Sequence, residues 1–345
     1  MNFKIRKMFL TLAIGIMIMA SITGCSSPKE NGSTDGSQNE QKKYVTFAAN
    51  PSSSAFYPYW VAVGKAVQET YPEFQVTVSE SQGAVDIVNR IRSGESILGN
   101  SISTTDFENY TGTGAFEGNA DNTARVLWYY AVSPMYICTS QDSGITNVSD
   151  LAGQKFNLGG TGTSGAVLAN DIFNLLGIKV DSFESSQSDA ADAYASRQIK
   201  GTIKFGSVSG DSYVMQLNAA LPINIVSFTD EQLEKITTAF PYLKEITIPA
   251  GTYEGIDYEV KTVAFYQGAA STTKLTQEEG YKIIKSVYDD GKAIIDAGFP
   301  TGANNDILEM ALISSIPLHA GTVQYMVEKG MEVPKELIPA EYVAK

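Results

Sequence analysis

The sequence predicts a two-lobed α/β protein in which one lobe is inserted into the chain of the other. From Tyr44 onward, strand-like segments alternate with segments of helical periodicity, as in parallel sheets joined by crossover helices. This alternation restarts after Asp150. Two long apolar segments, residues 125–139 and 261–267, are placed to cross between the lobes. Two such crossings would form hinge strands beside a ligand cleft.

Three strand-and-helix pairs make up the start of the first lobe. Strands are predicted over residues 44–48, 74–78 and 96–101, where apolar residues alternate or cluster. Residues 125–139 then supply one long strand, or two that are separated at Pro134. The helices follow from apolar residues three to four positions apart. These residues are Trp60, Val63 and Val67 in the first helix, and Ala84, Ile87, Val88 and Ile91 in the second, while the third helix begins near Thr104.

The second lobe begins in the same way. A strand at residues 155–158 and a glycine-rich loop at 159–165 lead into a helix, which Gly177 ends. The apolar face of that helix consists of Leu168, Ile172, Leu175 and Leu176. Further strands are predicted at 180–183, 202–205 and 224–228, with a short helix at 211–218. Helices at 277–296, 304–313 and 321–329 would return to the first lobe. We therefore place the first lobe at residues 44–135 plus 260–345 and the second at 136–259.

The first 24 residues are predicted to be a signal peptide. Lys4, Arg6 and Lys7 precede a short apolar run, and small residues lead to Cys25. Ile22-Thr23-Gly24-Cys25 resembles a bacterial lipobox, which implies lipidation of Cys25; an ordinary secretory signal is the alternative. Residues 25–43 are polar and read as a flexible tether. No later segment reaches the roughly 20 apolar residues of a membrane span.

Composition excludes several classes of function. The chain is 43% hydrophobic and 18% charged, which is ordinary for a globular protein, and its formal net charge is −13. An acidic protein repels phosphate backbones, so nucleic acid is not expected as a partner. Cys138 lies in an apolar stretch and is predicted to be a buried free thiol. His319 is predicted to be a helix-entry or packing residue, so we expect no metal site, no cofactor and no enzymatic activity.

The loop Gly159-Gly160-Thr161-Gly162-Thr163-Ser164-Gly165 is the most informative candidate site. Its glycines permit close approach to the backbone, and the amides at the start of the following helix carry partial positive charge. This pattern favours a cradle for a carboxylate or another anion. The alternative is a tight turn in which Thr163 or Ser164 only caps the helix. The lysine of a phosphate-binding Walker A loop is missing.

Polar residues also follow the other predicted strands, where ligands bind in open α/β sheets. Each hydroxyl could instead be a helix cap. Lys204 could project toward an anionic ligand or occupy a solvated strand position, and the latter is the more common case. No arginine is expected at a strand's carboxyl end. The candidate ligand-binding residues are Ser53, Ser54, Tyr57, Gln82, Gly83 and Ser101 in the first lobe, and Gly162, Thr163, Ser164, Gly165 and Ser207 in the second.

Several segments together resemble the TAXI receptors, the solute-binding subunits of tripartite ATP-independent periplasmic (TRAP) transporters. These segments are residues 142–145, 150–155, 159–165, 248–253 (Ile-Pro-Ala-Gly-Thr-Tyr) and 316–321 (Ile-Pro-Leu-His-Ala-Gly). The similarity runs from about Val45 to Gly330.

The resemblance implies a periplasmic-binding-protein fold of type II and a cleft that holds a small acid such as glutamate, glutamine or a dicarboxylate. It also implies delivery to TRAP permease subunits in the membrane. With the lipid anchor, we expect a protein held on the outer side of the cell membrane. Two alternatives stay open: a receptor that reports to a membrane sensor, and an enzyme on the same fold.

Overall fold

The structure is a computed structural model that describes residues 42–52, 54–208 and 210–344. The predicted signal peptide, Cys25, almost all of the tether and Ser53 lie outside the described residues. Residues 41–345 form one compact unit. Within the described residues, no helix combines the length and the apolar character needed to cross a membrane.

The central sheet has the order β2-β1-β3-β10-β4-β7, with β8 paired to β4 and β9 paired to β10. Strands β1, β2 and β3 are parallel, whereas β10 runs antiparallel to both β3 and β4. The strands are β1 (Lys43–Ala49), β2 (Phe74–Glu80), β3 (Leu98–Ile102), β4 (Ala124–Ser140), β7 (Gly201–Phe205), β8 (Ile223–Ile225), β9 (Lys244–Ile248) and β10 (Val260–Thr272). A separate parallel pair is formed by β5 (Lys155–Phe156) and β6 (Asp181–Ser182).

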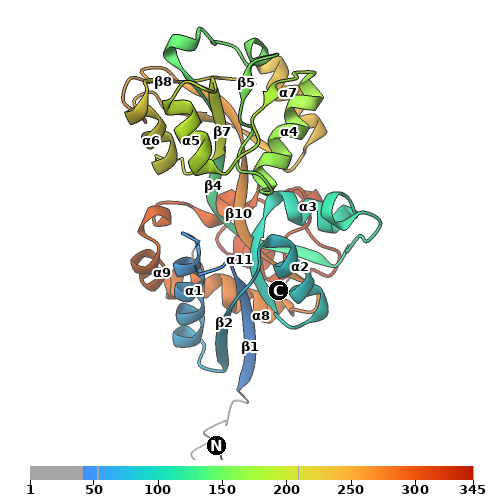
Figure 1. Ribbon diagram of the computed structural model, residues 1–345. Helices are drawn as coiled ribbons and strands as arrows, with labels where there is room; N and C mark the ends of the chain where they lie inside the picture. Colours follow the sequence, from blue (N-terminus) through green and yellow to red (C-terminus); the bar gives the residue numbers. More distant parts are fainter. Residues whose placement is uncertain (1–41, 53, 209, 345) are drawn as a thin grey trace, which may run out of the picture. The chain divides into compact units, whose positions relative to one another are not determined.

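Two groups of helices lie at the two ends of β4 and β10 (Figure 1). The first group contains α1 (Tyr57–Thr70), α2 (Ala84–Ser93), α3 (Ser103–Thr111), α8 (Gln277–Lys285), α9 (Lys292–Gly298), α10 (Ile307–Ala311) and α11 (Ala320–Glu328). The second contains α4 (Ser164–Leu176), α5 (Gln187–Ala195), α6 (Ser212–Ala220) and α7 (Asp230–Ala239).

Separate hydrophobic cores define the two lobes. One core draws on residues between Val45 and Ala131 and between Ala264 and Leu337, and we call the part around it the first lobe. Two adjoining cores use buried residues between Met135 and Val263, and the part around them is the second lobe. Strands β4 and β10 are shared by both, so the chain leaves the first lobe once and returns once.

Strand β4 is continuous, although a break at Pro134 was one of the two possibilities that the sequence left open. Pro134 lies opposite Ala264 of β10, and its carbonyl accepts a hydrogen bond from the amide of Gly206 at 3.1 Å. The neighbouring residues of β4 keep their pairing with β10 and β7. Antiparallel partners on both sides hold the strand extended through a residue that lacks an N–H group.

A buried polar network ties the first lobe together. The Asn100 Oδ1 atom on β3 accepts hydrogen bonds from Trp60 Nε1 at 3.0 Å and from the Tyr130 hydroxyl at 2.6 Å. These contacts connect α1, β3 and β4 in the interior. Because a buried amide oxygen without partners is costly, Asn100 fixes how the three elements pack.

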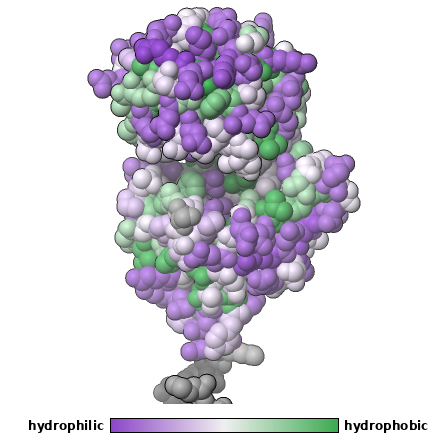
Figure 2. All heavy atoms as spheres, viewed as in Figure 1, coloured by the Kyte–Doolittle hydropathy of each residue, from purple (hydrophilic) through white to green (hydrophobic). Residues whose placement is uncertain are grey.

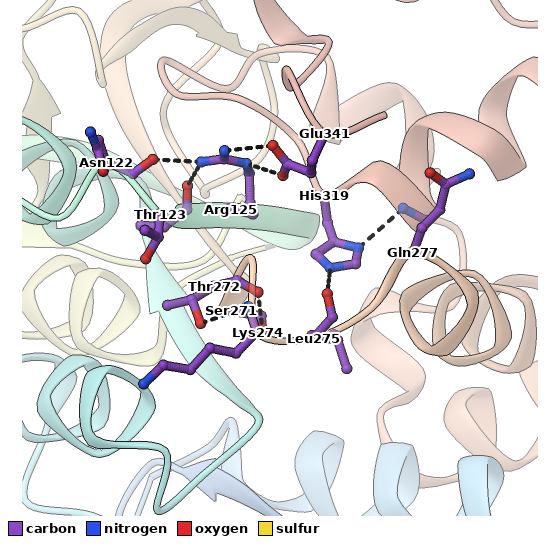
Figure 3. Close-up of polar contacts among 12 residues, drawn as sticks. Asn122, Thr123, Arg125, Ser271, Thr272, Lys274, Leu275, Gln277, His319 and Glu341 are labelled. Carbon is purple, nitrogen blue, oxygen red and sulfur yellow. Dashed lines mark hydrogen bonds and ion pairs between the residues drawn. The ribbon is translucent and has the colours of Figure 1, made fainter. Parts of the chain in front are cut away.

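Two side chains, Arg125 and His319, form further polar contacts in the first lobe (Figure 3). Arg125 at the start of β4 donates from Nε and Nη2 to the Glu341 carboxylate, at 2.7 and 2.9 Å. His319 is the N-cap of α11; its Nδ1 accepts from the amide of Gly321, and its Nε2 donates to the carbonyl of Leu275. The histidine is therefore a buried helix-entry residue, as predicted.

Some elements differ from the sequence predictions. Helices α5 and α7 and strand β9 were not predicted, and the helix expected over 277–296 is interrupted by a wider turn at Ser286–Asp290. The helix expected over 304–313 shortens to Ile307–Ala311. Cys138 is fully buried and has no disulfide, as predicted; burial raises the pKa of its thiol well above the usual range.

Candidate functional site

The second lobe contains a pocket of about 170 Å³ beside the glycine-rich loop. The molecular surface is hollowed between the two lobes (Figure 2). Among the described residues, no Asp or Glu contributes to the pocket wall. The lining residues are Leu158, Gly159, Gly160, Thr163, Gly165, Ala166, Gln187, Ile203, Lys204, Phe205 and Phe265.

Thr163 is the N-cap of α4. Its Oγ1 accepts a hydrogen bond from the amide of Ala166 at 3.2 Å and donates to the carbonyl of Gly160 at 2.7 Å. The hydroxyl proton is therefore already used within the loop. The capping interpretation of this residue holds, and any contact with a ligand would involve a remaining acceptor position of the oxygen.

The backbone amides of the first two residues of α4 are the hydrogen-bond donors at this loop that stay available to a ligand. Among the described residues, Ser164 and Gly165 donate no backbone hydrogen bond, as expected for the start of a helix. Gly165 lines the pocket, whereas Ser164 is exposed and does not. Gly162 is also exposed, with φ of 79°, and is not part of the pocket wall. Of the four predicted residues in the loop, Thr163 and Gly165 thus reach the pocket.

Lys204 supplies the positive charge of the pocket. It lies half-buried on β7, and its Nζ donates to Gln187 Oε1 at 3.1 Å. Among the described residues, no carboxylate forms an ion pair with this ammonium group. The sequence singled out Lys204 but favoured a solvated position; the structure places it in the wall of the pocket instead. Gln187, the first residue of α5, lies in a polar segment, 185–189, that the sequence places at a strand end, but it was not named as a candidate ligand-binding residue because α5 itself was not predicted.

The candidate residues of the first lobe that the structure describes do not join this pocket. Ser54 and Tyr57 are half-buried at the start of α1, where Ser54 Oγ accepts from the amide of Phe56 at 3.2 Å and Tyr57 packs on the first core. Ser54 therefore acts in the turn before α1. Ser207 in the second lobe is exposed, and its carbonyl accepts from the Tyr136 hydroxyl.

The amides of Gln82 and Gly83, which lie directly before α2, are already engaged. Gln82 donates its backbone N–H to the Asp86 carboxylate at 3.0 Å, and Gly83 donates to Ser81 Oγ at 3.3 Å. The backbone hydrogen bond from Gln82, followed by the contact with the Arg90 guanidinium, holds the pKa of Asp86 below its usual value. The negative charge of Asp86 offsets the partial positive charge at this helix start, so it offers less to an anion than α4 does.

Ser101 is buried against a carboxyl group. Its hydroxyl donates to Asp106 Oδ2 at 3.0 Å, and the Tyr129 hydroxyl donates to the same oxygen at 3.0 Å. Burial raises the pKa of Asp106 to about 7, although both hydrogen bonds act in the opposite direction. The hydroxyl of Ser101 is thus directed at Asp106, a partner that the sequence analysis did not identify.

The arginines of the described residues are all engaged with carboxylates. Arg125 binds Glu341, and Arg197 Nε lies 3.0 Å from Asp142 Oδ2. The other two pairs are Arg90 with Asp86 at 3.1 Å and Arg92 with Asp121 at 3.8 Å. None of the four lines the pocket. An arginine clamp is therefore absent from this site.

Comparison with solved structures identifies the fold. The chain is similar to a TctC solute-binding protein from Polaromonas, at 12% identity over 75% of this chain and 88% of that one, with a TM-score of 0.51. A putative sulfonate-binding protein, SsuA of Methylobacillus flagellatus, has 14% identity over 88% and 93% of the two chains and a TM-score of 0.48. The probable amino-acid-binding protein YtmK of Bacillus subtilis has 12% identity over 78% and 98%, with a TM-score of 0.42.

The predicted two-lobed α/β fold is confirmed: the fold is that of a periplasmic solute-binding protein. At the level of sequence, residues 47–330 match the NMT1-like family. That segment includes both lobes and the strands that link them. Because the match extends over most of the chain, this protein belongs to the NMT1-like family.

Proposed function

We propose that this protein is an extracellular solute-binding lipoprotein that captures a small carboxylate and delivers it to a TRAP-type permease. The observation that carries the proposal is the charge of the second-lobe pocket. In a chain with a formal charge of −13, the described residues that line this pocket include one lysine, four residues of the glycine-rich loop, and no acidic side chain. Such a pocket stabilises an anion.

Glutamate, glutamine and dicarboxylates are the candidate ligands, from the resemblance to TAXI receptors. The same resemblance, in residues 248–253 and 316–321, supports a TRAP permease as the partner. Crosslinking in the native membrane should then recover a multi-spanning permease; recovery of a sensor protein would favour the signalling alternative. Ile22-Thr23-Gly24-Cys25 supports a lipid anchor at Cys25.

Binding of the free acid can be compared with binding of a neutral analogue. Native mass spectrometry of the gently purified protein should detect a bound small carboxylate. By calorimetry, glutamate or glutarate should bind, and dimethyl glutarate should bind about tenfold to a hundredfold more weakly, because charge-assisted hydrogen bonds contribute roughly 1.5–3 kcal/mol each. A diester that binds as tightly as the diacid would overturn the carboxylate assignment while leaving the fold in place.

A further inference from the structure

Within the described part of the chain, the charge of Lys204 has no acidic partner. It lies on β7 opposite Tyr136 of β4, between the apolar residues Ile203 and Phe205. Its Nζ has a neutral acceptor, Gln187 Oε1, and no ion pair among the described residues. Because a partly buried ammonium group without a counter-charge is costly, a bound anion would stabilise it.

Among the residues that the structure describes, none of those around Lys204 in the pocket wall is acidic. Gln187 and Gly160 form the adjacent wall: a Cβ atom on Gly160 would lie 3.4 Å from Gln187 Cγ. The remaining lining residues carry no carboxylate. The pocket volume of about 170 Å³ is also large enough to hold more than a single water molecule.

The other wall of the pocket is apolar. The rings of Phe205 and Phe265 lie 5.2 Å apart between centroids, at an interplanar angle of 35°. Leu158, Ile203 and Ala166 continue this surface. A hydrocarbon segment of the ligand, next to its bound charge, would be removed from water by this wall, which is favourable. A second charge of the ligand at this place would lose its hydration without gaining a partner, which is unfavourable.

We infer that Lys204 is the residue that selects the ligand, and that the selected group is a carboxylate attached to a hydrocarbon segment. The inference rests on the proposed function. The carboxylate contacts Lys204 Nζ, and the methylene groups beside it pack on Phe205 and Phe265. A short-chain monocarboxylate or dicarboxylate fits this description, as does glutamate entering through its side-chain carboxylate. The α-amino carboxylate end of an amino acid fits less well, since its ammonium group would lie near Lys204.

Gln187 is assigned as the positioning residue. As an amide, it holds the Lys204 ammonium by one hydrogen bond and leaves its charge intact. Gln187→Glu would place a carboxylate beside the same atom and neutralise it. Because Gln187 is the first residue of α5, an acidic side chain there is compatible with the helix.

The test is the ratio of affinities for pentanoate and its neutral isostere pentanamide, measured by calorimetry on the full mature protein. Glutarate and glutaramide are measured in parallel, because binding can require a polar group at both ends of the ligand. Wild type should prefer the acid by about tenfold or more. Lys204→Met and Gln187→Glu should each bring the ratio close to one. Lys200→Met is the matched control, since it removes a lysine from an exposed position of the same lobe and should leave the ratio unchanged.

The possible outcomes separate the two proposals. An unchanged ratio in Lys204→Met, or an equal loss of acid and amide binding in that variant, would overturn the role of Lys204. A wild-type protein that binds glutamate but neither pentanoate nor glutarate, and whose Lys204→Met variant keeps the wild-type affinity for glutamate, would overturn the ligand class. If wild type binds no carboxylate at all, the proposed function itself fails. Retained melting transitions in both variants exclude unfolding as the cause.

Discussion

Ser101 shows how a single residue can depart from its sequence-based interpretation. The hydroxyl of Ser101 was expected to reach a ligand, yet it is 1% exposed and directed at Asp106, which is 2% exposed. Sequence reasoning locates a hydroxyl at the end of a strand, but it does not show which neighbouring group the hydroxyl will contact. Here the contact is made by a residue only five positions along the chain, after a turn into α3.

This buried carboxyl group predicts a pH dependence of stability. The pKa of Asp106 is about 7 in the folded protein and 3.8 as its ordinary value. The folded state therefore binds more protons between these values, and the contribution of this group to stability is lost as pH rises toward 7. Relative to Asp106→Asn, wild type should lose up to about 1.4 kcal/mol per pH unit over that interval.

Urea denaturation of both proteins between pH 5 and 8 measures this difference. Other titrating groups act equally in the two proteins and cancel in the comparison. Parallel pH profiles for wild type and Asp106→Asn would contradict the assignment.

At the scale of elements, the start of α4 links the fold to the pocket. Thr163 caps the helix and also holds the carbonyl of Gly160, which lies in the pocket wall. Thr163→Ala should therefore destabilise the protein by about 1 kcal/mol, the usual effect of losing a side-chain cap.

Ser164→Ala is the matched control for this prediction. Ser164 is exposed, occupies the next position and has no capping role in the structure, so its change should stay within about 0.5 kcal/mol. Urea denaturation measures both variants. Equal effects of the two substitutions would show that the cap at Thr163 contributes nothing specific.

The elements that sequence patterns missed have a common physical reason. Helix α5 (Gln187–Ala195) is rich in alanine, and its buried face includes Ala190, Ala191 and Tyr194, which give a weak apolar periodicity. Strand β9 alternates between exposed and half-buried residues until Ile248. Both elements depend on packing partners outside their own segment: β9 pairs with β10, and α5 contacts α6 and β7. Local patterns therefore predicted the strongly apolar elements and missed these.

For the whole molecule, the proposed lipid anchor predicts where the protein is found. Cys25→Ser should leave the protein unprocessed or release it from the membrane into the medium, and should abolish labelling by a radioactive fatty acid, because the thiol is the proposed acceptor. Cys138→Ser is the control: Cys138 is buried in β4 and should have no effect on labelling. Fatty-acid label that persists in the Cys25→Ser protein would contradict the anchor.

The sequence by itself determined the alternation of strands and helices, the second start after Asp150, and the two apolar segments that became β4 and β10. These features follow from the order of apolar and polar residues along the chain, which gives the period of each element and the side that it buries. Ile22-Thr23-Gly24-Cys25 and the TAXI-like segments likewise need no structure to be recognised, and they remain the basis of the anchor and permease proposals.

Only the tertiary structure decided which polar residues share a site. It brought Lys204 of β7, Gln187 of α5 and Phe265 of β10 to one pocket with the glycine loop, and it turned Ser54, Gln82 and Ser101 toward neighbours within the protein. Hydrogen-bonding groups are satisfied by whichever partner folding brings near. For these three residues that partner lies two to five positions away along the chain. Spacing along the chain therefore located the loops, whereas the packing of the strands and helices selected the side chains that remain available to a ligand.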